Sequence, residues 1–368
     1  MAANLQSWPI PAAALEPAEP APVERTAAAP ARVFGFEFTG DAREFFGIWI
    51  VNILLSVITL GIYSAWATVR TRRYFYGHTL LDGIGFDSLA KPTQILKGRL
   101  VVAAFFVAWA VLAQLTPWTD LALGLLLLPV IPWAVVRALS FARRYSSYRN
   151  IRFGFDGEWR EGFGVYILLP VAAVVSLGLL YPYAIYRRRR FQVEHSRFGR
   201  TPFAFDGATA GYFYPYLAAF ALSLVLFALA AFGLATLHSI KDMPSVTLRV
   251  LEVVIALGFA LGQLALYVQL ATRLENYGWS RTRIGADRFE LALEFGALYR
   301  IYLTNIIAIA LTVGLAIPWA KVRLARYRLA RFSLHAAGDL DGHIAQEREQ
   351  MAALGQELGD ALDLDLGM

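Results

Sequence analysis

The chain has 368 residues, of which 57% are hydrophobic and only 17% are charged, whereas a soluble domain carries about 25% charged residues. It contains no cysteine, which excludes disulfides, thiolate catalysis and cysteine-ligated metal centres. The apolar residues are concentrated in blocks, several of which reach the roughly 20 residues that cross a bilayer core about 30 Å thick. The seven blocks are residues 45–66, 100–115, 121–136, 162–186, 211–237, 250–272 and 297–320. This pattern excludes an ordinary soluble protein.

The two ends of the chain differ in composition from this apolar core. Residues 1–32 are rich in alanine and proline and contain no apolar run, so we predict a disordered tail without a secretory signal. Residues 333–368 are strongly acidic, and their apolar residues recur at helical spacing, which predicts an acidic tail with a short amphipathic helix. Because the whole chain still has a net charge of +6, the core is strongly basic.

The core contains an internal repeat. A shift of 117 residues places residues 36–86 on residues 153–203, and a shift of 253 residues finds a third copy that ends the core. The positions of Asn52, Gly61, Trp66 and Arg70, for example, are occupied in the third copy by Asn305, Gly314, Trp319 and Arg323. We therefore divide the core into a first repeat with a helix pair (33–149), a second repeat with a helix pair (150–280) and a partial third repeat (281–332).

Each repeat begins with alternating aromatic residues, which predict a short strand, and continues into an apolar helix. The apolar run is interrupted at the same place in every copy, by Thr-Leu-Gly (59–61), Ser-Leu-Gly (176–178) or Thr-Val-Gly (312–314). Glycine weakens a helix by about 1 kcal/mol, and an interior proline by about 3 kcal/mol. We therefore predict helix breaks at Gly61, Gly178, Pro182, Gly314 and Pro318.

The arginine clusters constrain the topology. They follow almost every second apolar block, and the positive-inside rule places all of them in the cytoplasm. We therefore predict an all-α polytopic membrane protein with short cytoplasmic β elements, in which three of the seven apolar segments are repeat-related and broken or re-entrant. The segments near 97–116, 120–140, 211–237 and 248–272 are then the true crossings, and both termini are cytoplasmic. The alternative is seven ordinary spans with one violation of the charge rule.

The first repeat resembles a known family. The stretch Glu-Phe-Phe-Gly-Ile-Trp (44–49), followed by Thr-Leu-Gly-Ile-Tyr (59–63) and by Trp-Ala-Thr-Val-Arg-Thr-Arg-Arg-Tyr (66–74), is similar to the signature of the YjgN-like bacterial inner-membrane proteins. The resemblance extends over about residues 33–335. It implies a multi-pass protein of the bacterial inner membrane without an established biochemical activity, and it assigns no functional residues.

Three groups of residues are candidates for a site. Arginine beside tryptophan and tyrosine is suited to lipid headgroups, polar residues inside apolar blocks pack helices or line a path, and tryptophans anchor a helix at the interface. The headgroup candidates are Arg70, Arg72, Arg73, Arg187, Arg189, Arg190, Arg323 and Arg326. The intramembrane polar candidates are Asn52, Asn305, Glu252 and Gln263, and the interfacial anchors are Trp66, Trp133 and Trp319.

Catalytic chemistry has no support in the sequence. The five histidines form no metal-binding pattern, and no nucleophile elbow, phosphate-binding loop or dinucleotide fingerprint is present. We therefore expect no enzyme activity, cofactor or metal, and we expect the bilayer, with its anionic lipids, as the partner rather than nucleic acid. Two functions stay open: a transporter or lipid-handling protein, or a membrane scaffold that binds anionic lipid or a partner through its basic cytoplasmic face.

Overall fold

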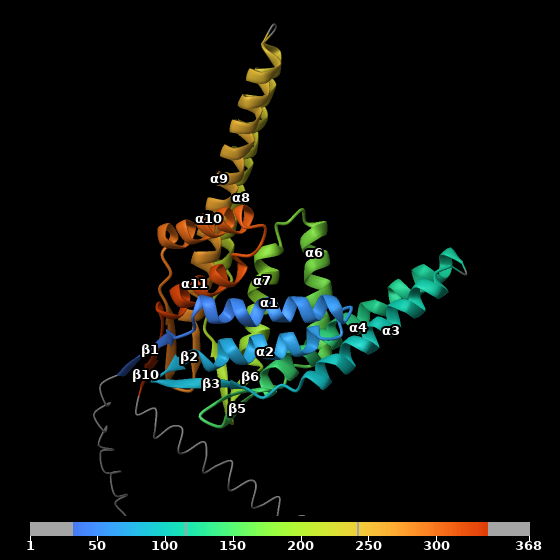
Figure 1. Ribbon diagram of the computed structural model, residues 1–368, viewed down its shortest axis with the longest axis vertical. Coiled ribbons are helices and arrows are strands. Elements are labelled where there is room, and N and C mark those ends of the chain that lie inside the picture. Colours follow the sequence, from blue (N-terminus) through green and yellow to red (C-terminus); the bar gives the residue numbers. More distant parts are fainter. Residues whose placement is uncertain (1–31, 115, 241–242, 338–368) are drawn as a thin grey trace, which may run out of the picture.

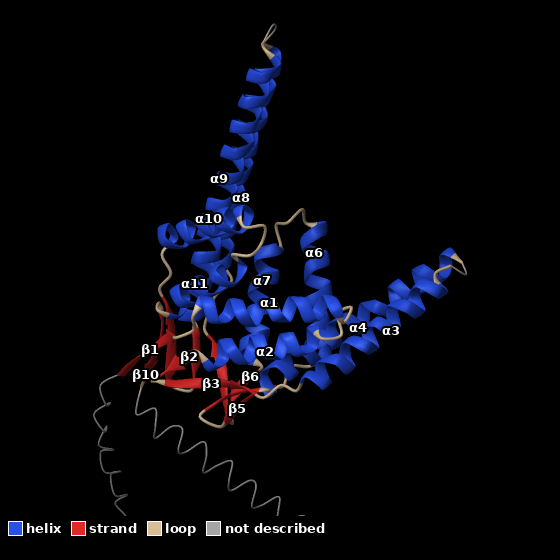
Figure 2. Ribbon diagram, viewed as in Figure 1, coloured by secondary structure: helices blue, strands red, loops and turns tan. Residues whose placement is uncertain are grey.

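The computed structural model describes residues 32–114, 116–240 and 243–337. Ten short strands gather at one end of the molecule, and helices extend from them (Figures 1 and 2). The strands are β1 Arg32–Phe38, β2 Thr79–Leu81, β3 Ile84–Ser88, β4 Ser146–Tyr148, β5 Ile151–Phe155, β6 Ser196–Phe198, β7 Thr201–Phe205, β8 Thr282–Ile284, β9 Asp287–Leu291 and β10 Phe332–Ala336. The helices are α1 Ala42–Ile58, α2 Ser64–Gly77, α3 Pro92–Leu112, α4 Pro117–Arg144, α5 Trp159–Phe163, the π-helical η2 Gly164–Leu168, α6 Leu169–Val175, α7 Tyr181–Glu194, α8 Ala210–Ser239, α9 Ser245–Ser280, α10 Phe295–Leu311 and α11 Ile317–Leu329.

The predicted tails fall largely outside these ranges. The disordered segment before Arg32 and the amphipathic helix after residue 337 lie outside the described residues. Arg32 itself begins β1, and residues 332–336 form β10. The last part of the core is therefore a strand that precedes the acidic tail.

The ten strands form a closed antiparallel barrel. Its order is β1-β10-β9-β8-β7-β6-β5-β4-β3-β2, and β2 pairs with β1 again. The closing pair joins the first and last strands, with Gly35 opposite Ser333. Closure pairs the backbone groups that a sheet edge would leave free. Both ends of the described chain therefore lie at the barrel.

The barrel is built from one spacing of residues that recurs along the chain. An aromatic residue near the end of a helix is followed after five residues by serine or threonine, after seven by an apolar residue and after twelve by phenylalanine. This spacing begins at Tyr74, Phe141, Phe191 and Tyr277. A fifth copy begins at Tyr327, has Phe332 in place of the serine or threonine, and is completed by β1 at the other end of the chain, because β1 and β10 are neighbours. The barrel therefore consists of five equivalent units.

Two-residue turns fix the register of the hairpins within these units. Asp82 and Gly83 join β2 to β3, and Arg149 and Asn150 join β4 to β5, with positive φ at all four residues. This geometry is that of a type I′ turn, which matches the right-handed twist of the strands and favours asparagine, aspartate and glycine.

A tyrosine hydroxyl joins a helix to the segment between an odd-numbered strand and the next helix in three of the five units. The backbone N–H of Asp41 donates to the Tyr74 hydroxyl at 2.8 Å, and that hydroxyl donates to the Asp41 carbonyl. Tyr277 makes the same contact with Ala208, and Tyr327 makes it with Glu294. Burial raises the pKa of Tyr74 to about 12, so this hydroxyl keeps the proton that it donates.

A helix pair connects each unit to the next, and two of the five pairs are long. The pairs α3/α4 and α8/α9 project from the rest of the molecule in different directions (Figure 1). They contain the four described helices that are long and apolar enough to cross a membrane: Pro92–Leu112, Trp118–Arg144, Ala210–Ser239 and Ser245–Ser280. Their apolar side chains are largely exposed, as expected of helices that contact lipid.

The other three pairs are short and contain the three sequence repeats. Their turns share one geometry, in which the φ angles of Gly61, Gly178 and Gly314 are 90°, 90° and 92°. The glycine N–H donates to the carbonyl five residues earlier at 2.7–2.8 Å, which closes the first helix with a Schellman-type cap.

A threonine or serine then bonds the residue that precedes the second helix of each short pair. The hydroxyls of Thr59, Ser176 and Thr312 accept the N–H of the residue four positions later at 2.9–3.0 Å. The motif Thr/Ser-x-Gly therefore marks the turn between the two helices of a short pair. Pro182 and Pro318 lie in the first turn of the second helix, where a proline is tolerated, and not at the break itself.

The all-α prediction with seven apolar segments is wrong. The structure is a closed ten-stranded barrel with four helices long enough to span a membrane, and the other three apolar blocks are the short helix pairs. The barrel is difficult to predict because its even-numbered strands β2, β4, β6 and β8 have only three residues each and directly follow helices. A strand of that length carries almost no periodic signal.

Candidate functional site

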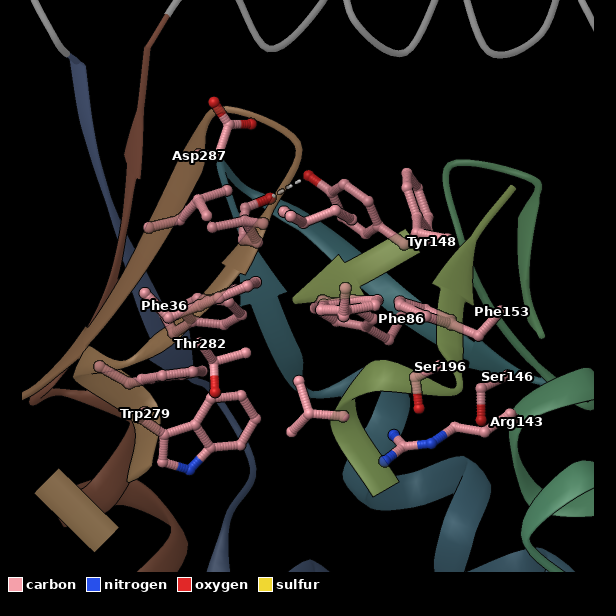
Figure 3. A pocket seen from close by; sticks show the side chains of 18 of the residues that line it. Phe36, Phe86, Arg143, Ser146, Tyr148, Phe153, Ser196, Trp279, Thr282 and Asp287 are labelled. Atoms are coloured by element: carbon pink, nitrogen blue, oxygen red, sulfur yellow. Dashed lines mark hydrogen bonds between the residues drawn. The ribbon is translucent and has the colours of Figure 1, made fainter. Parts of the chain in front are cut away.

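Six phenylalanine rings form a closed circle inside the barrel. Each ring stacks on the next with centroids 4.5–6.5 Å apart and interplanar angles of 14–27°. In order around the barrel they are Phe36, Phe86, Phe153, Phe203, Phe289 and Phe332. Three of them are labelled at mid-height in Figure 3. We call these six residues the phenylalanine circle.

The circle follows from the register of the strands. Five of its members lie directly opposite an apolar residue of the neighbouring even-numbered strand. The pairs are Phe36–Leu81, Phe86–Tyr148, Phe153–Phe198, Phe203–Ile284 and Phe289–Leu334. Opposite residues on one face of a sheet have Cβ atoms about 5 Å apart, so both sets point into the barrel and line it with apolar side chains.

The barrel encloses a cavity of about 330 Å³. Eight strands give a barrel whose side chains just fill the interior, and ten strands give a wider one. The cavity is lined by the phenylalanine circle and, toward the helices, by Tyr76, Arg143, Arg189, Gln192 and Trp279. Its volume is at the lower end of the range for small-molecule sites.

The hydroxyl groups near the helical end of the cavity are already bonded. Ser146, Ser196 and Thr282 donate to the carbonyls four residues earlier at 2.6–2.8 Å. They close the last turns of α4, α7 and α9, and Figure 3 shows them below the phenylalanine circle. These hydrogen bonds join the end of each helix to the strand that follows it.

Two arginines give this end of the cavity a positive charge. Arg143 from α4 extends beneath the phenylalanine circle, close to Ser196 in the view of Figure 3. Arg189 from α7 lies over the ring of Trp279, with its guanidinium carbon 4.4 Å from the ring centroid. Neither arginine forms an ion pair with an acidic residue in the part of the chain that the structure describes.

Arg189 has hydrogen-bonding capacity that the protein does not use. Its Nε and one Nη atom are buried and have no partner among the described residues, and the same is true of the nearby Tyr212 hydroxyl. Burial lowers the pKa of Arg189, and the like charge of Arg143 lowers it further, but an arginine stays protonated in a protein. Buried donors without a partner are costly.

The predicted headgroup arginines are not brought together. Arg70, Arg72 and Arg73 are exposed on α2. On α7, Arg187 lies 3.9 Å from Glu161 and Arg190 bonds Glu194 at 2.9 Å, while Arg189 alone reaches the cavity.

The two headgroup candidates on α11 contact other parts of the chain. Arg323 donates to Thr304 at 2.6 Å and to Asn305 at 3.3 Å. Arg326 donates to the Gly40 carbonyl at 2.9 Å. The eight arginines therefore occupy three separate regions.

The predicted polar residues form contacts between paired helices. Asn52 and Asn305 each donate to the carbonyl of the residue fifteen positions later, Ala67 and Ala320, at 3.5 Å. Both are buried, and the equal spacing reflects the repeat. These contacts favour a packing role over a place on a substrate path.

The remaining two polar candidates lie in the long pair α8/α9. Gln263 exchanges hydrogen bonds with Ser223 at 2.9–3.1 Å, and Glu252 lies 3.1 Å from His238. This histidine is therefore the partner of Glu252. Both contacts hold the two helices together.

The predicted tryptophan anchors occupy equivalent positions. Trp66, Trp133 and Trp319 each lie eight residues before the aromatic residue that opens a unit, on α2, α4 and α11. Trp133 and Trp319 are exposed. No group of three potential metal ligands occurs among the described residues.

Sequence reasoning missed the cavity and its residues Arg143, Tyr148 and Trp279. A usable signal was present, because the spacing of aromatic, Ser/Thr, apolar and phenylalanine positions can be read from the sequence at four places. Extended sequence identity links only the three units that also share the Thr/Ser-x-Gly turn. The units that follow the long helix pairs share only the aromatic, Ser/Thr, apolar and phenylalanine positions, which are too few to stand out as a repeat.

Comparisons with known proteins agree with the predicted resemblance. A family model described as a bacterial protein of unknown function, DUF898, matches residues 34–361. The chain is 33% identical over 141 residues to the inner membrane protein YjgN of Salmonella typhimurium (38% of this chain, 36% of the relative). It is 28% identical over 152 residues to the inner membrane protein YjgN of Escherichia coli K12 (40% and 37%).

These alignments are partial. The matched part of the chain spans little more than a third of the length of the curated relatives, and no solved structure matches it significantly. The family model, in contrast, covers most of the chain. The chain therefore belongs to the DUF898 family of bacterial proteins, and the predicted YjgN-like family is confirmed.

Proposed function

We propose that the protein is a lipid-handling protein of the bacterial inner membrane, whose barrel binds a small apolar molecule that carries an anionic group. The observation that carries this proposal is that Arg143 and Arg189, neither of which forms an ion pair among the described residues, line an aromatic cavity. The phenylalanine circle would contact the apolar part of the ligand. Arg143 and Arg189 would bind its carboxylate, sulfonate or phosphate group, for which a guanidinium is well suited.

The size of the cavity limits the ligand. A volume of about 330 Å³ holds about ten groups of the size of a water molecule, each of which takes about 30 Å³ in the liquid. A medium-chain fatty acid fits this volume, whereas both acyl chains of a phospholipid do not. The proposal is therefore the binding of one short acyl or aromatic acid.

The lining favours binding over catalysis. The hydroxyls of Ser146, Ser196 and Thr282 are committed to helix carbonyls, and Asp287 accepts the N–H of Ala337 at 2.9 Å. Nucleophilic catalysis needs a nucleophile within reach of a base, and the described lining contains neither cysteine nor histidine. We propose a binding function without an enzymatic step.

The membrane placement follows from apolar surface and charge. We propose that the four long helices cross the bilayer and that the barrel and both termini are cytoplasmic. Among the described residues, the far ends of the two long pairs have few basic residues, such as Arg249, while the arginine clusters lie toward the barrel. These clusters would contact anionic lipid headgroups.

The turns of the short pairs support the same placement. Leu60, Leu177 and Val313 lie at the tips with positive φ and are 94%, 86% and 93% exposed. A large apolar residue is unfavourable at such a position in water, where glycine or asparagine is preferred. Contact with lipid explains why three equivalent turns present an apolar side chain.

Direct binding tests the cavity. Radiolabelled decanoate is added to the purified protein in amphipol, with unlabelled decanoate or decanol as competitor. We expect saturable binding that decanoate displaces and decanol does not, because decanol lacks the charge. Arg189→Gln should weaken binding at least about tenfold, since a charge-assisted hydrogen bond contributes about 1.5–3 kcal/mol. The matched control is Arg188→Gln, whose parent residue is an exposed neighbour, and its affinity should be unchanged.

Two results would contradict the proposal. One is equal displacement by decanol and decanoate, and the other is equal affinity of the Arg189→Gln and Arg188→Gln proteins. The placement is tested separately by single cysteines at Trp118 and at Arg288, probed with an impermeant maleimide on intact cells. We expect labelling at position 118 only, and labelling at position 288 would place the barrel outside the cytoplasm.

A further inference from the structure

Two hollows outside the barrel recur at equivalent places. The first, of about 370 Å³, lies between α11 and the start of α1, and the second, of about 440 Å³, lies between α4 and the start of α5. We call them the α11/α1 groove and the α4/α5 groove. In each, the second helix of one unit faces the residues that begin the helix pair of the next unit. Recurrence in two units indicates a built feature of the fold.

The two grooves have matching residues at matching positions. A tryptophan and an arginine lie eight and four residues before the aromatic residue that opens the unit. They are Trp319 and Arg323 in the α11/α1 groove, and Trp133 and Arg137 in the α4/α5 groove. A carboxylate lies opposite in both cases, as Asp41 and Glu158, each three residues after the end of an odd-numbered strand. A second arginine completes each lining, Arg326 and Arg160.

The α4/α5 groove keeps its polar groups free. Arg137, Ser140 and Glu158 have no side-chain partner among the described residues, and Trp133 is 55% exposed beside the apolar surface of α4. In the α11/α1 groove, Arg323 lies over Trp319 with its guanidinium carbon 5.0 Å from the ring centroid. Asp41 uses one carboxylate oxygen to cap α1, and its other oxygen has no described partner.

This set of groups matches one headgroup chemistry. Arginine binds a phosphate through charge-assisted hydrogen bonds, a carboxylate binds an ammonium, and tryptophan prefers the level of the headgroups and glycerol backbone. We infer that each groove binds the headgroup of one aminophospholipid, with the phosphate on Arg323 or Arg137 and the ammonium on Asp41 or Glu158. The acyl chains then follow the exposed apolar face of the adjacent helix. None of the groove residues named above lines the barrel cavity.

The inference depends on the proposed membrane placement but not on the cavity ligand. The grooves open on the outside of the helices, whereas the cavity lies inside the barrel. A protein that loses lipid from a groove should therefore still bind decanoate with its normal affinity. This separates failure of one proposal from failure of the other.

Lipid counting by native mass spectrometry tests the inference. The full-length protein is delipidated in detergent and titrated with dioleoylphosphatidylethanolamine. We expect two lipids to bind ahead of the rest, and Arg137→Gln combined with Glu158→Gln should remove one of them, with about a tenfold loss of affinity at that site. Arg288→Gln, on the outside of the barrel, is the matched control and should keep both. Unchanged circular dichroism and thermal unfolding of the double variant ensure that lost lipid reflects the groove.

Three probes resolve the chemistry of the groove. Dioleoylphosphatidylglycerol lacks the ammonium and should bind more weakly than the ethanolamine lipid, and dioleoylglycerol lacks the phosphate and should bind weakest. Inorganic phosphate at millimolar concentration should leave both lipids bound. The inference is overturned if the double variant retains both lipids, if dioleoylglycerol binds as well as the aminophospholipid, or if inorganic phosphate displaces the lipid, which would indicate a free-anion site.

Discussion

The short and the long helix pairs occupy equivalent places between barrel strands, yet they differ in almost every other respect. The short pairs α1/α2, α6/α7 and α10/α11 turn at a shared Thr/Ser-x-Gly motif. The long pairs α3/α4 and α8/α9 lack this motif and contain the four helices that could span a bilayer. The barrel therefore tolerates very different insertions, provided that each pair returns the chain to the next strand.

This difference separates two kinds of apolar surface. The apolar residues of the barrel pack on each other, in the phenylalanine circle and its opposite partners. Those of the long pairs remain exposed in the folded chain. In such a protein the barrel can be stabilised by its own packing, while the long helices still need another apolar environment to cover their surface.

Removing one ring of the phenylalanine circle should have the largest effect on stability. Phe36→Ala deletes a buried side chain that stacks on Phe86 and Phe332, and such a deletion costs about 3–5 kcal/mol. Thermal unfolding of the protein in detergent measures the loss. The control in a long pair, Phe106→Ala, removes an exposed ring and should change stability by less than about 0.5 kcal/mol. Equal losses at the two positions would remove the distinction between packed and exposed apolar residues.

The turns of the short pairs should be the next most sensitive. Gly61→Ala leaves enough space for the added methyl group but forces alanine to a φ of 90°, which costs about 1–2 kcal/mol. In the long pair, Gly98→Ala also has space but lies within a helix, where alanine is better by about 0.5–1 kcal/mol. The two changes should therefore shift the unfolding temperature in opposite directions. A shift in the same direction would show that the turn geometry does not distinguish the pairs.

Part of this arrangement could be predicted from sequence, and part could not. The helix breaks at Gly61, Gly178 and Gly314 could be predicted because a glycine recurs in all three repeats, two residues after a threonine or serine. The apolar runs also identified the four long helices near their observed bounds. The barrel was missed because its pairings join strands such as β1 and β10 from opposite ends of the chain, and a local pattern holds no information about such partners.

The site could be predicted even less than the fold. Phe36, Phe153 and Phe203 stood out as repeat positions, but nothing in a linear pattern shows that six rings meet in a circle. Arg189 was one of eight candidate arginines, and only the structure separates it from its exposed neighbour Arg188. Its place over Trp279 in the cavity lining is a tertiary property, so a local sequence signal cannot supply it.

The tyrosine contacts should give a smaller effect. Tyr277→Phe removes the hydroxyl that accepts the N–H of Ala208 at 2.7 Å, and a hydrogen bond of this kind contributes about 0.5–1.5 kcal/mol. Phe191 already occupies the same position in another unit, so the ring itself should be tolerated. Tyr214→Phe, at an exposed position of α8, is the control for thermal unfolding. No difference between the two variants would mean that the hydroxyl does not stabilise the junction of helix and strand.

Acid should have the smallest effect. The hydrogen bond from Arg331 lowers the pKa of Glu294 below its ordinary value of 4.5. A carboxyl group with a lowered pKa stabilises the fold above its unfolded-state pKa, and this contribution is lost as the pH falls through the folded-state pKa. Between pH 5 and pH 3, the protein should lose slightly more stability than Glu294→Gln does, as followed by thermal unfolding. A larger loss in the variant would reverse the assigned sign.

Barrel closure is the claim on which the five-unit account depends, and a disulfide across β1 and β10 tests it most directly. The chain contains no cysteine, so Gly35→Cys with Ser333→Cys introduces a single pair at directly opposite positions. Under mild oxidation the account predicts an intramolecular disulfide that shifts mobility on a non-reducing gel, as efficiently as the pair Arg283→Cys with Arg288→Cys within the β8–β9 hairpin. Efficient cross-linking of the hairpin pair without any cross-linking between positions 35 and 333 would contradict a closed barrel.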